Sequence, residues 1–374
     1  MKRAASDPMP EYQFLSSEKV LCDDLNGRHV YDITLNNAET EIHITNLGCA
    51  ITEICIPDRM GVRRNIVAGY DHLEAYGRNP HYFGCIIGRN TNRIADGQFT
   101  LNGRTVQLSC NEGENHLHGG FDGFHKKIWE IGAMIHSEEA VGVILKHTSP
   151  DGEEGYPGTL QVQVKYMLDV SGKLSIHYTA VTDQPTPVNL SNHSYFNLSG
   201  FEDMVIYDHI LHIHAAGYTE KNGKNLPTGR LLPLGGTLLD FSTPRRIGAY
   251  IDQFPSDRGF DHNYILDRSF PGPHPASAPL PNSATPAIAA ELFDPGSGRM
   301  LKVATTQPGI QLYTANWWDG TITGKQGKPY CKHGAVALET QAFPDSPNHP
   351  AFPDTILYPG DTYRSTTEFQ FGVI

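Results

Sequence analysis

Apolar and polar residues alternate in short runs along most of the chain. A period of two is typical of strands that bury one face. The longest series of runs spans residues 128–182 and predicts a β-meander, with apolar positions at Val141, Val143 and Leu145, at Val162, Val164 and Tyr166, and at Leu174, Ile176 and Tyr178. No segment of ten or more residues has convincing helical spacing, and residues 71–76 predict only one helical turn. The pattern therefore predicts an all-β protein.

Turn residues separate these runs. Pro57–Gly61 predicts a turn between two strands, and the Asn-Gly pair at residue 102 predicts a tight hairpin. The Pro-, Ala- and Ser-rich stretch 271–287 predicts a loop insertion, because strand patterning resumes on both sides of it. No break in composition divides the chain. We therefore expect a flexible tail over residues 1–14 and one large antiparallel β-sandwich domain over 15–374.

One stretch, residues 186–200, has an unusual polar face. If it is a strand, one face carries only uncharged polar groups and an imidazole, at Asn189, Ser191, His193, Tyr195 and Asn197. A solvated face usually carries Lys, Glu and Thr, so this one is typical of the floor of a polar pocket. A buried hydrogen-bond network without chemistry is the alternative interpretation.

The composition narrows the range of partners. Of the 374 residues, 39% are hydrophobic and 19% are charged, which is typical of a globular protein. The net charge of -12 argues against nucleic acid or an anionic membrane as the main partner, because those need a basic surface. A neutral sugar fits this charge. No run approaches the roughly 20 apolar residues of a membrane span, and residues 1–14 lack the apolar run of a signal peptide.

Cysteines and sequons favour a cytoplasmic protein. No C-x-x-C pair or metal-ligand spacing occurs among the cysteines, so we expect mostly buried free thiols at Cys22, Cys49, Cys55, Cys85, Cys110 and Cys331. Asn189, Asn192 and Asn197 each begin an N-x-S sequon. In a secreted eukaryotic chain, glycans there would fall inside the predicted pocket.

His193 and Glu339 form the candidate catalytic pair. Glu339 lies in a predicted strand, 335–341, whose same face carries small alanines that leave room around the carboxylate. Glutamate is rarely buried unless it is paired. An imidazole and a carboxylate together can take and give a proton near neutral pH. The alternative is that Glu339 lies on an ordinary surface face.

The other candidate groups have both structural and functional interpretations. His116 with His118 and His212 with His214 have H-x-H spacing that can serve a metal, but no third ligand is evident, so polar strand residues are favoured and no metal is predicted. His125 and His349 are expected on the surface. Hydrogen-bonding groups suited to sugar hydroxyls, or to solvent, occur at Asn92, Arg93, Asp261, His262 and Asn263. The tryptophan rings could stack on a sugar, but packing in the core or in loops is the favoured interpretation for Trp129, Trp317 and Trp318.

Six segments in order resemble the aldose 1-epimerases, or galactose mutarotases, and the resemblance extends from about Asn46 to the C-terminus. Four of the segments are similar to the family motifs G-R-x-x-N-R-I, N-x-L-H-G-G, H-x-Y-F-N-L and D-x-x-Y/F, and they are, in that order, Gly88–Ile94, Asn115–Gly120, His193–Leu198 and Asp261–Tyr264. The other two are Gln307–Tyr313 and Leu338–Gln341. Each segment alone is weak, but six in order over about 250 residues are specific. The Pro- and Ala-rich stretch 271–287 departs from the family pattern.

The resemblance implies a fold, an activity and a site. The family fold is a large antiparallel β-sandwich, the galactose mutarotase-like supersandwich. The family roles place the general acid at His193 and the general base at Glu339. They place sugar contacts at Asn92, Arg93, His118, Ser194, Tyr195, Asp261 and Gln311. Strict alternation puts Ser194 opposite His193, and a bulge or a strand end would reconcile the two.

The expected function is the interconversion of α and β anomers of free hexoses such as galactose or glucose, without metal or cofactor. The expected partner is a small-molecule aldose, and both a monomer and a homodimer remain open. Three alternatives are a sugar-phosphate 1-epimerase, a non-catalytic carbohydrate-binding protein, and a metal-dependent enzyme that uses His116 and His118.

Overall fold

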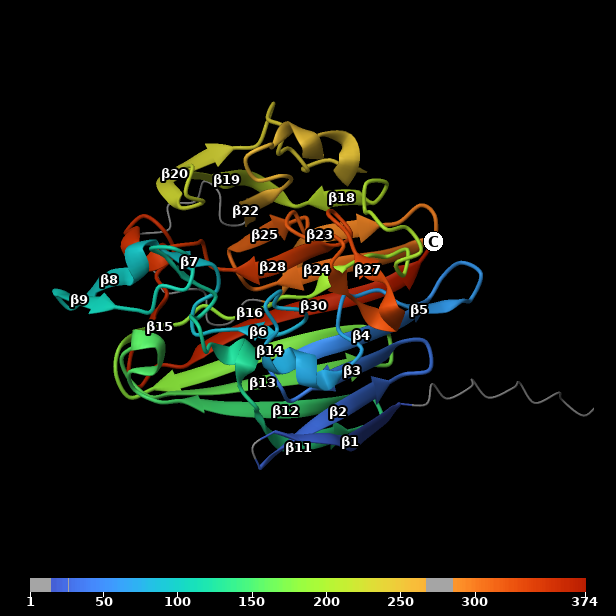
Figure 1. Cartoon of the computed structure of the whole chain (residues 1–374), viewed down its shortest axis with the longest axis horizontal. Coiled ribbons are helices and arrows are strands. Elements are labelled where there is room, and N and C mark those ends of the chain that lie inside the picture. Colours follow the sequence, from blue (N-terminus) through green and yellow to red (C-terminus); the bar gives the residue numbers. More distant parts are fainter. Residues whose placement is uncertain (1–14, 26, 267–284) are drawn as a thin grey trace, which may run out of the picture.

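The computed structural model describes residues 15–25, 27–266 and 285–374. The expected tail, 1–14, and most of the expected insertion, 271–284, lie outside the described residues. Within the described residues the chain is built from strands and short 3₁₀ helices, and all pairs of named strands are antiparallel. The predicted all-β antiparallel sandwich class is therefore confirmed (Figure 1).

The largest sheet has nine strands and extends from the lower to the upper part of the molecule in Figure 1. In spatial order its strands are β11 (Glu130–His136), β12 (Ala140–Ser149), β13 (Leu160–Asp169), β14 (Lys173–Thr182), β30 (Tyr363–Val373), β24 (Arg299–Thr305), β23 (Ala287–Phe293), β18 (Ile210–Ile213) and β21 (Arg245–Arg246). The first four strands confirm the predicted meander. The last strand of the chain, β30, pairs with β14 and β24 in the interior of this sheet.

Two further sheets pack with the nine-stranded sheet. A six-stranded sheet has the order β17 (Tyr195–Phe196), β28 (Val336–Gln341), β25 (Gly309–Tyr313), β22 (Asp261–Leu266), β19 (Ala215–Lys221) and β20 (Pro227–Pro233). A five-stranded sheet has the order β1 (Ser16–Leu25), β2 (Arg28–Asn36), β3 (Glu41–Thr45), β4 (Ala50–Pro57) and β5 (Arg63–Asn65). One continuous core joins the three sheets, for example through Ile44, Ile176 and Ile310.

The remaining elements are small. Two-stranded pairs are formed by β7 (Arg93–Ile94) with β10 (His116–Leu117), β8 (Gln98–Leu101) with β9 (Arg104–Gln107), β6 (Ile86–Ile87) with β16 (Ser191–Asn192), β15 (Thr186–Pro187) with β29 (Ile356–Leu357), and β26 (Ile322–Thr323) with β27 (Pro329–Tyr330). The 3₁₀ helices include η1 (Leu73–Gly77), η2 (Ala95–Gly97), η3 (Phe124–Lys126), η4 (Glu153–Gly155), η5 (Ile247–Ala249), η6 (Ile251–Gln253), η8 (Lys325–Gly327) and η9 (Ser346–Asn348). Among the described residues, no helix has the length and apolar character needed to cross a bilayer.

The local predictions hold where adjacent residues decide the geometry. Asn102 and Gly103 both have positive φ, 51° and 76°, as a tight hairpin turn between β8 and β9 requires. The amide of Gly61 donates to the carbonyl of Asp58 at 2.9 Å and closes the predicted turn between β4 and β5. The helical turn is η1.

The prediction of one continuous strand over residues 186–200 is wrong. The chain forms three two-residue strands here, and each pairs with a different partner: β15 with β29, β16 with β6, and β17 with β28. Every residue from 186 to 200 is buried, so the stretch has no solvated face. Changing partners breaks the alternation, because each new pairing resets the orientation of the chain.

Two surface or burial predictions need correction, and a third, on the tryptophans, holds for two of its three residues. His125 is buried, and His349 is half-buried beside Asp345. The cysteines are all free, but only Cys49 and Cys85 are buried, and Cys22 is exposed. Trp129 and Trp318 are packed in the interior, whereas Trp317 is exposed and lies 4.9 Å from the guanidinium of Arg258.

Candidate active site

His193 lies in the short break between β16 and β17, and backbone hydrogen bonds hold it there. Its amide donates to the carbonyl of Cys85 at 2.9 Å, and its carbonyl accepts from the amide of Gly84 at 3.0 Å. Gly84 has φ +62°, and a Cβ atom there would lie 1.8 Å from the carbonyl oxygen of Ile51. Only glycine fits this close approach. The chain on each side of the imidazole is therefore fixed by contacts about 100 residues away in sequence.

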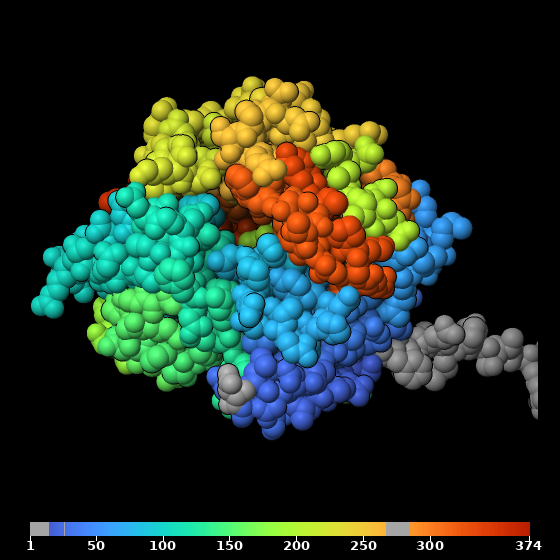
Figure 2. Space-filling model, in the orientation of Figure 1, coloured from blue at the N-terminus to red at the C-terminus, as the bar shows by residue number. Residues whose placement is uncertain are grey.

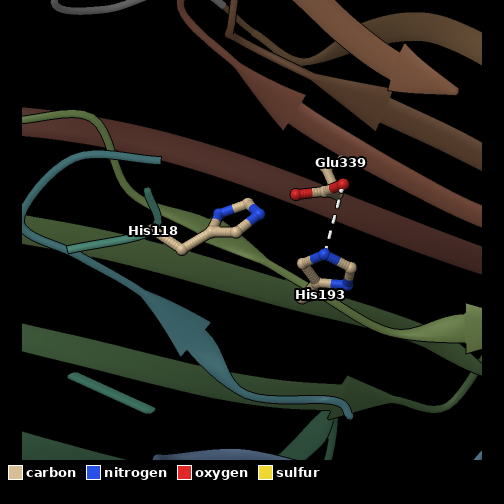
Figure 3. A group of neighbouring side chains, drawn as sticks. All are labelled: His118, His193 and Glu339. Atoms are coloured by element: carbon tan, nitrogen blue, oxygen red, sulfur yellow. Dashed lines mark ion pairs between the residues drawn. The ribbon is translucent and has the colours of Figure 1, made fainter. Parts of the chain in front are cut away.

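Glu339 lies in the middle of β28, and its carboxylate faces His193 (Figure 3). The Glu339 Oε1 and His193 Nε2 atoms are 3.4 Å apart, and each side chain is only 3% exposed. The second atom of each group, Oε2 of Glu339 and Nδ1 of His193, is buried and has no hydrogen-bond partner among the described residues. Unpaired buried polar atoms are costly and are common at sites that await a ligand. The surface-face alternative for Glu339 is therefore wrong.

Burial shifts the pKa of both groups in opposite directions. It raises the pKa of Glu339 from 4.5 to about 8, with a further contribution from the nearby charge of Asp261 and an opposing one from Arg93. It lowers the pKa of His193 from 6.5 to about 4. Between these values the pair holds one exchangeable proton, on either the carboxylate or the imidazole. Such a pair is suited to taking a proton from one atom of a substrate and giving one to another.

His118 is the third member of this cluster, and its ring lies beside the pair (Figure 3). The His118 and His193 ring centroids are 5.3 Å apart. Its Nδ1 accepts a hydrogen bond from the amide of Asn92 at 3.3 Å, which assigns the ring proton to Nε2. Burial, together with the neighbouring His193, holds the pKa of His118 well below its ordinary value. His118 is thus a neutral hydrogen-bond donor.

His116, the other histidine of the H-x-H motif, has a structural environment. Its Nδ1 contacts the carbonyl oxygen of Ser109 at 2.7 Å, and its Nε2 contacts the hydroxyl of Tyr156 at 2.7 Å. Both ring nitrogens are therefore engaged within the small core beneath β7 and β10. The alternative in which His116 and His118 share a metal ion is not supported by these contacts.

A polar cleft adjoins the pair. Figure 2 shows a hollow on this face of the molecule, bordered by the cyan, gold and orange parts of the chain. The cleft near Glu339 is lined by Asn92, Arg93, Thr219, Lys221, Asn225, Pro227, Asp261, Asn263, Gln311 and Pro344. Strand register brings part of this lining next to Glu339, because Gln311 on β25 pairs with Glu339 on one side and with Asn263 on the other.

The charged groups of the cleft are held in place by one another. Arg93 donates from Nε and Nη2 to the carboxylate of Glu112, at 2.7 and 2.6 Å. Gln311 donates from Nε2 to Oδ1 of Asp261 at 2.5 Å. Burial alone would raise the pKa of Asp261, but the charges of Lys221 and Arg93 outweigh it and hold that pKa below its ordinary value. The cleft therefore presents fixed donors and an ionised acceptor.

Ser194 and Tyr195 are both beside His193. The strand ends at residue 192 and resumes at Tyr195, which removes the alternation argument against Ser194. The Ser194 hydroxyl is buried and has no hydrogen-bond partner among the described residues. The Tyr195 ring lies 4.8 Å from that of His193 and packs on Phe83 and Trp318. Tyr195 thus forms part of the wall that orients the imidazole.

Sequence reasoning missed Tyr82 and Lys221. The Tyr82 ring stacks on His193, with centroids 5.9 Å apart, and also packs against His118 and His125. Lys221 donates to the backbone carbonyl of Asp261 at 2.7 Å. Neither residue is in a motif or an alternating run, so the sequence offers no signal that could have found them.

Two groups of side chains among the described residues have donor atoms close enough to hold a metal ion. In each group the potential ligand atoms lie within 4.8 Å of one another. The first group is the buried cluster of His118, His193 and Glu339. The second is half-buried and consists of His212, His214 and Glu291.

A buried imidazole–carboxylate pair beside a polar cleft, in an antiparallel β-sandwich, is typical of an enzyme that transfers protons on a small polar substrate. Comparison with known proteins identifies the protein family. The family model described as "Aldose 1-epimerase" matches residues 31–370. The chain therefore belongs to the aldose 1-epimerase family and is an isomerase with aldose 1-epimerase activity.

Relatives and solved structures agree with this assignment. The chain is 42% identical to the galactose mutarotase of Bos taurus over 349 residues, which cover 93% of this chain and 96% of the relative. It is 35% identical to the aldose 1-epimerase of Escherichia coli (strain K12), over 90% of this chain and 93% of the relative. The crystal structure of galactose 1-epimerase from Lactobacillus acidophilus NCFM superposes with a TM-score of 0.81 at 26% identity, covering 96% of this chain and 99% of that chain.

Proposed function

We propose that His193 and Glu339 are the acid and base that interconvert the α and β anomers of free hexoses, with galactose and glucose as the leading candidates. The observation that carries the proposal is the buried pair itself. Its two facing atoms are 3.4 Å apart, and each group keeps one buried atom without a partner. An anomeric centre has two oxygens on one carbon, and an acid and a base at this spacing suit both oxygens at once.

The reaction follows from the single proton that the pair shares. Glu339, as the carboxylate, takes the proton of the C1 hydroxyl while the C1–O5 bond breaks and C1 becomes an aldehyde. His193, as the imidazolium, gives its proton to the ring oxygen O5. Rotation about C1–C2 presents the other face of the aldehyde, and the ring closes with the two roles reversed. Acid–base steps of this kind each contribute about 10²–10⁴ in rate.

The remaining polar groups would bind and orient the sugar. His118, as a neutral donor, would hydrogen-bond an oxygen on which charge develops. Glu112 holds Arg93 by Nε and Nη2, which leaves Nη1 of Arg93 without a partner among the described residues. Contacts with the sugar hydroxyls are assigned to Asn92, Arg93, Ser194, Tyr195, Asp261 and Gln311.

The charge of the cleft favours a neutral sugar over a sugar phosphate. Its two cations, Arg93 and Lys221, are paired with Glu112 and Asp257 at 2.6 and 2.9 Å. Asp261 adds a further negative charge within the lining. A phosphate dianion would need unpaired Arg or Lys groups. Comparing rates on glucose and glucose 6-phosphate tests this preference, and a faster reaction with the phosphate would contradict it.

Anomer exchange with two single variants tests the assignment of acid and base. His193→Ala and Glu339→Ala should each lower the rate on freshly dissolved α-galactose or α-glucose by at least about 10²-fold, measured by polarimetry after subtraction of the spontaneous reaction. His177→Ala is the control, because His177 lies on β14 and contacts Thr366. A rate near wild type in either site variant would overturn the assignment. Sugar binding without rate acceleration by the wild-type protein would favour the carbohydrate-binding alternative.

We further infer that the protein works in the cytoplasm. Asn189, Asn192 and Asn197 begin sequons and are at most 5% exposed, so glycans attached there would prevent the chain from folding. Forcing the chain into the secretory pathway should then yield glycosylated, inactive protein. Active glycosylated protein would contradict this inference.

A further inference from the structure

A second cluster of ligating side chains lies outside the cleft, on the nine-stranded sheet. His212 is on β18, and His214 follows this strand at the point where the chain passes to β19 of the six-stranded sheet. Glu291 lies on the neighbouring strand β23, directly opposite His212 in the register. The three side chains are between 21% and 31% exposed. Solvent can therefore reach them, while the strands hold their backbone in place (Figure 1).

Two of the distances within this cluster match those of a tetrahedral metal site. Oε2 of Glu291 lies 3.4 Å from Nδ1 of His212 and 3.4 Å from Nε2 of His214. All three ligand atoms lie within 4.8 Å of one another. Zinc binds imidazole nitrogen and carboxylate oxygen at about 2.0–2.2 Å, so two ligands at tetrahedral angles are about 3.3–3.5 Å apart. The two contacts to Glu291 already have this spacing.

The carboxylate of Glu291 is held in the orientation that a metal ion requires. Lys302 on β24 lies 3.2 Å from Oε1, which leaves Oε2 for the two histidines. An ionised carboxylate with one oxygen fixed by a second group is a common arrangement around protein-bound metals.

We propose that His212, His214 and Glu291 form a binding site for a divalent transition metal ion, and that Zn²⁺ fits it best. Two imidazoles and one carboxylate are a ligand set that zinc uses, with water in the fourth position. A bound ion would tie β18 to β23 where the chain crosses between the nine-stranded and six-stranded sheets. Its effect would be on the stability of this crossover, since the catalytic pair belongs to a separate cluster.

Metal titration of the intact protein tests the site. The apoprotein, prepared with a chelator, is titrated with Zn²⁺ by calorimetry and with Co²⁺ by visible absorption, because tetrahedral Co²⁺ absorbs much more strongly than octahedral Co²⁺. The wild-type chain should bind one equivalent, give the tetrahedral Co²⁺ spectrum, and unfold at a higher temperature with Zn²⁺. His212→Ala and Glu291→Gln should each weaken binding by at least about tenfold.

Two variants separate this site from the rest of the molecule. His177→Ala removes a half-buried histidine from the same sheet and should leave Zn²⁺ binding unchanged. His193→Ala disables the catalytic cluster and should also leave it unchanged. Unaltered Zn²⁺ affinity in both His212→Ala and Glu291→Gln, loss of binding in His193→Ala, or no Zn²⁺ binding by the wild-type chain would each overturn the proposal. These outcomes are independent of whether the protein exchanges anomers.

Discussion

Replacing Glu339 by glutamine should stabilise the protein at neutral and alkaline pH while it abolishes catalysis. The carboxyl is fully buried and its folded pKa is about 8, whereas the unfolded chain ionises near the ordinary value of 4.5. Between these two pH values the folded state binds a proton that the unfolded state has lost. Stability therefore falls as the pH rises through this window. Glutamine has a similar shape, carries no charge and removes this dependence.

The size of the effect follows from the pKa difference. Each pH unit within the window lowers the free energy of unfolding by about 1.4 kcal/mol. The full difference between 4.5 and about 8 corresponds to about 5 kcal/mol, and the part between pH 5 and pH 7.5 to about 3 kcal/mol. His193 contributes an opposite slope below its unfolded value of 6.5. That slope is present in both proteins, so it cancels when the variant is compared with the wild type.

Urea unfolding at pH 5, 6.5 and 8 measures the difference in the free energy of unfolding between Glu339→Gln and the wild type. The stability advantage of Glu339→Gln over the wild type should grow with pH across this series. Glu130→Gln, at an exposed position on β11, controls for the substitution itself and should show a difference that does not change with pH. Parallel stability curves for wild type and Glu339→Gln would refute the reasoning, because they would show that the folded protein does not hold the carboxyl protonated.

Two further predictions concern the pair and its support. The rate constant kcat/KM for anomer exchange should be level between pH 5 and pH 7 and fall below about 4 and above about 8, because the pair gains a second proton at low pH and loses its only one at high pH. A midpoint at pH 6.5 in the rate profile would instead indicate an unperturbed histidine. Gly84→Ala should lower the free energy of unfolding by about 3 kcal/mol or more. It should also displace His193, because the added Cβ would collide with the carbonyl of Ile51. Gly103→Ala, with open space around its Cβ at a similar φ, should cost only about 1–2 kcal/mol, and equal losses at the two positions would contradict the steric argument.

The sequence predicts this fold best where neighbours in the chain are neighbours in space. The meander of β11 to β14 and the hairpin at Asn102 are local, and alternation and turn chemistry identify both. The stretch 186–200 fails because its short strands pair with segments far away, such as β16 with β6. The alternation of apolar and polar residues predicts which way side chains face only as long as the strand stays paired with the same partner.

The same distinction between local and distant contacts applies to the residues of the site. Motifs identify His193 and Glu339, but only the folded chain brings the break between β16 and β17 next to β28, where the two side chains meet. The half-buried Tyr82 packs against the buried His125 and against His193, and distant segments of the chain bring these rings together. Nothing in the residues flanking His125 distinguishes it from a surface histidine. The same limit applies to Glu291, which lies 77 residues beyond His214 and is invisible as a partner in sequence.

The position of β30 has a consequence for how the protein is made. This C-terminal strand fills the gap between β14 and β24, so the two halves of the nine-stranded sheet each have an open edge until it arrives. Among the described strands β30 is the last to emerge from a ribosome, so the edges of β14 and β24 stay open to pairing with other chains until synthesis reaches it. A chain truncated before Tyr363 would lack this strand, so it would keep the proposed catalytic pair but its main sheet would be divided. Such a product should be captured by chaperones or aggregate.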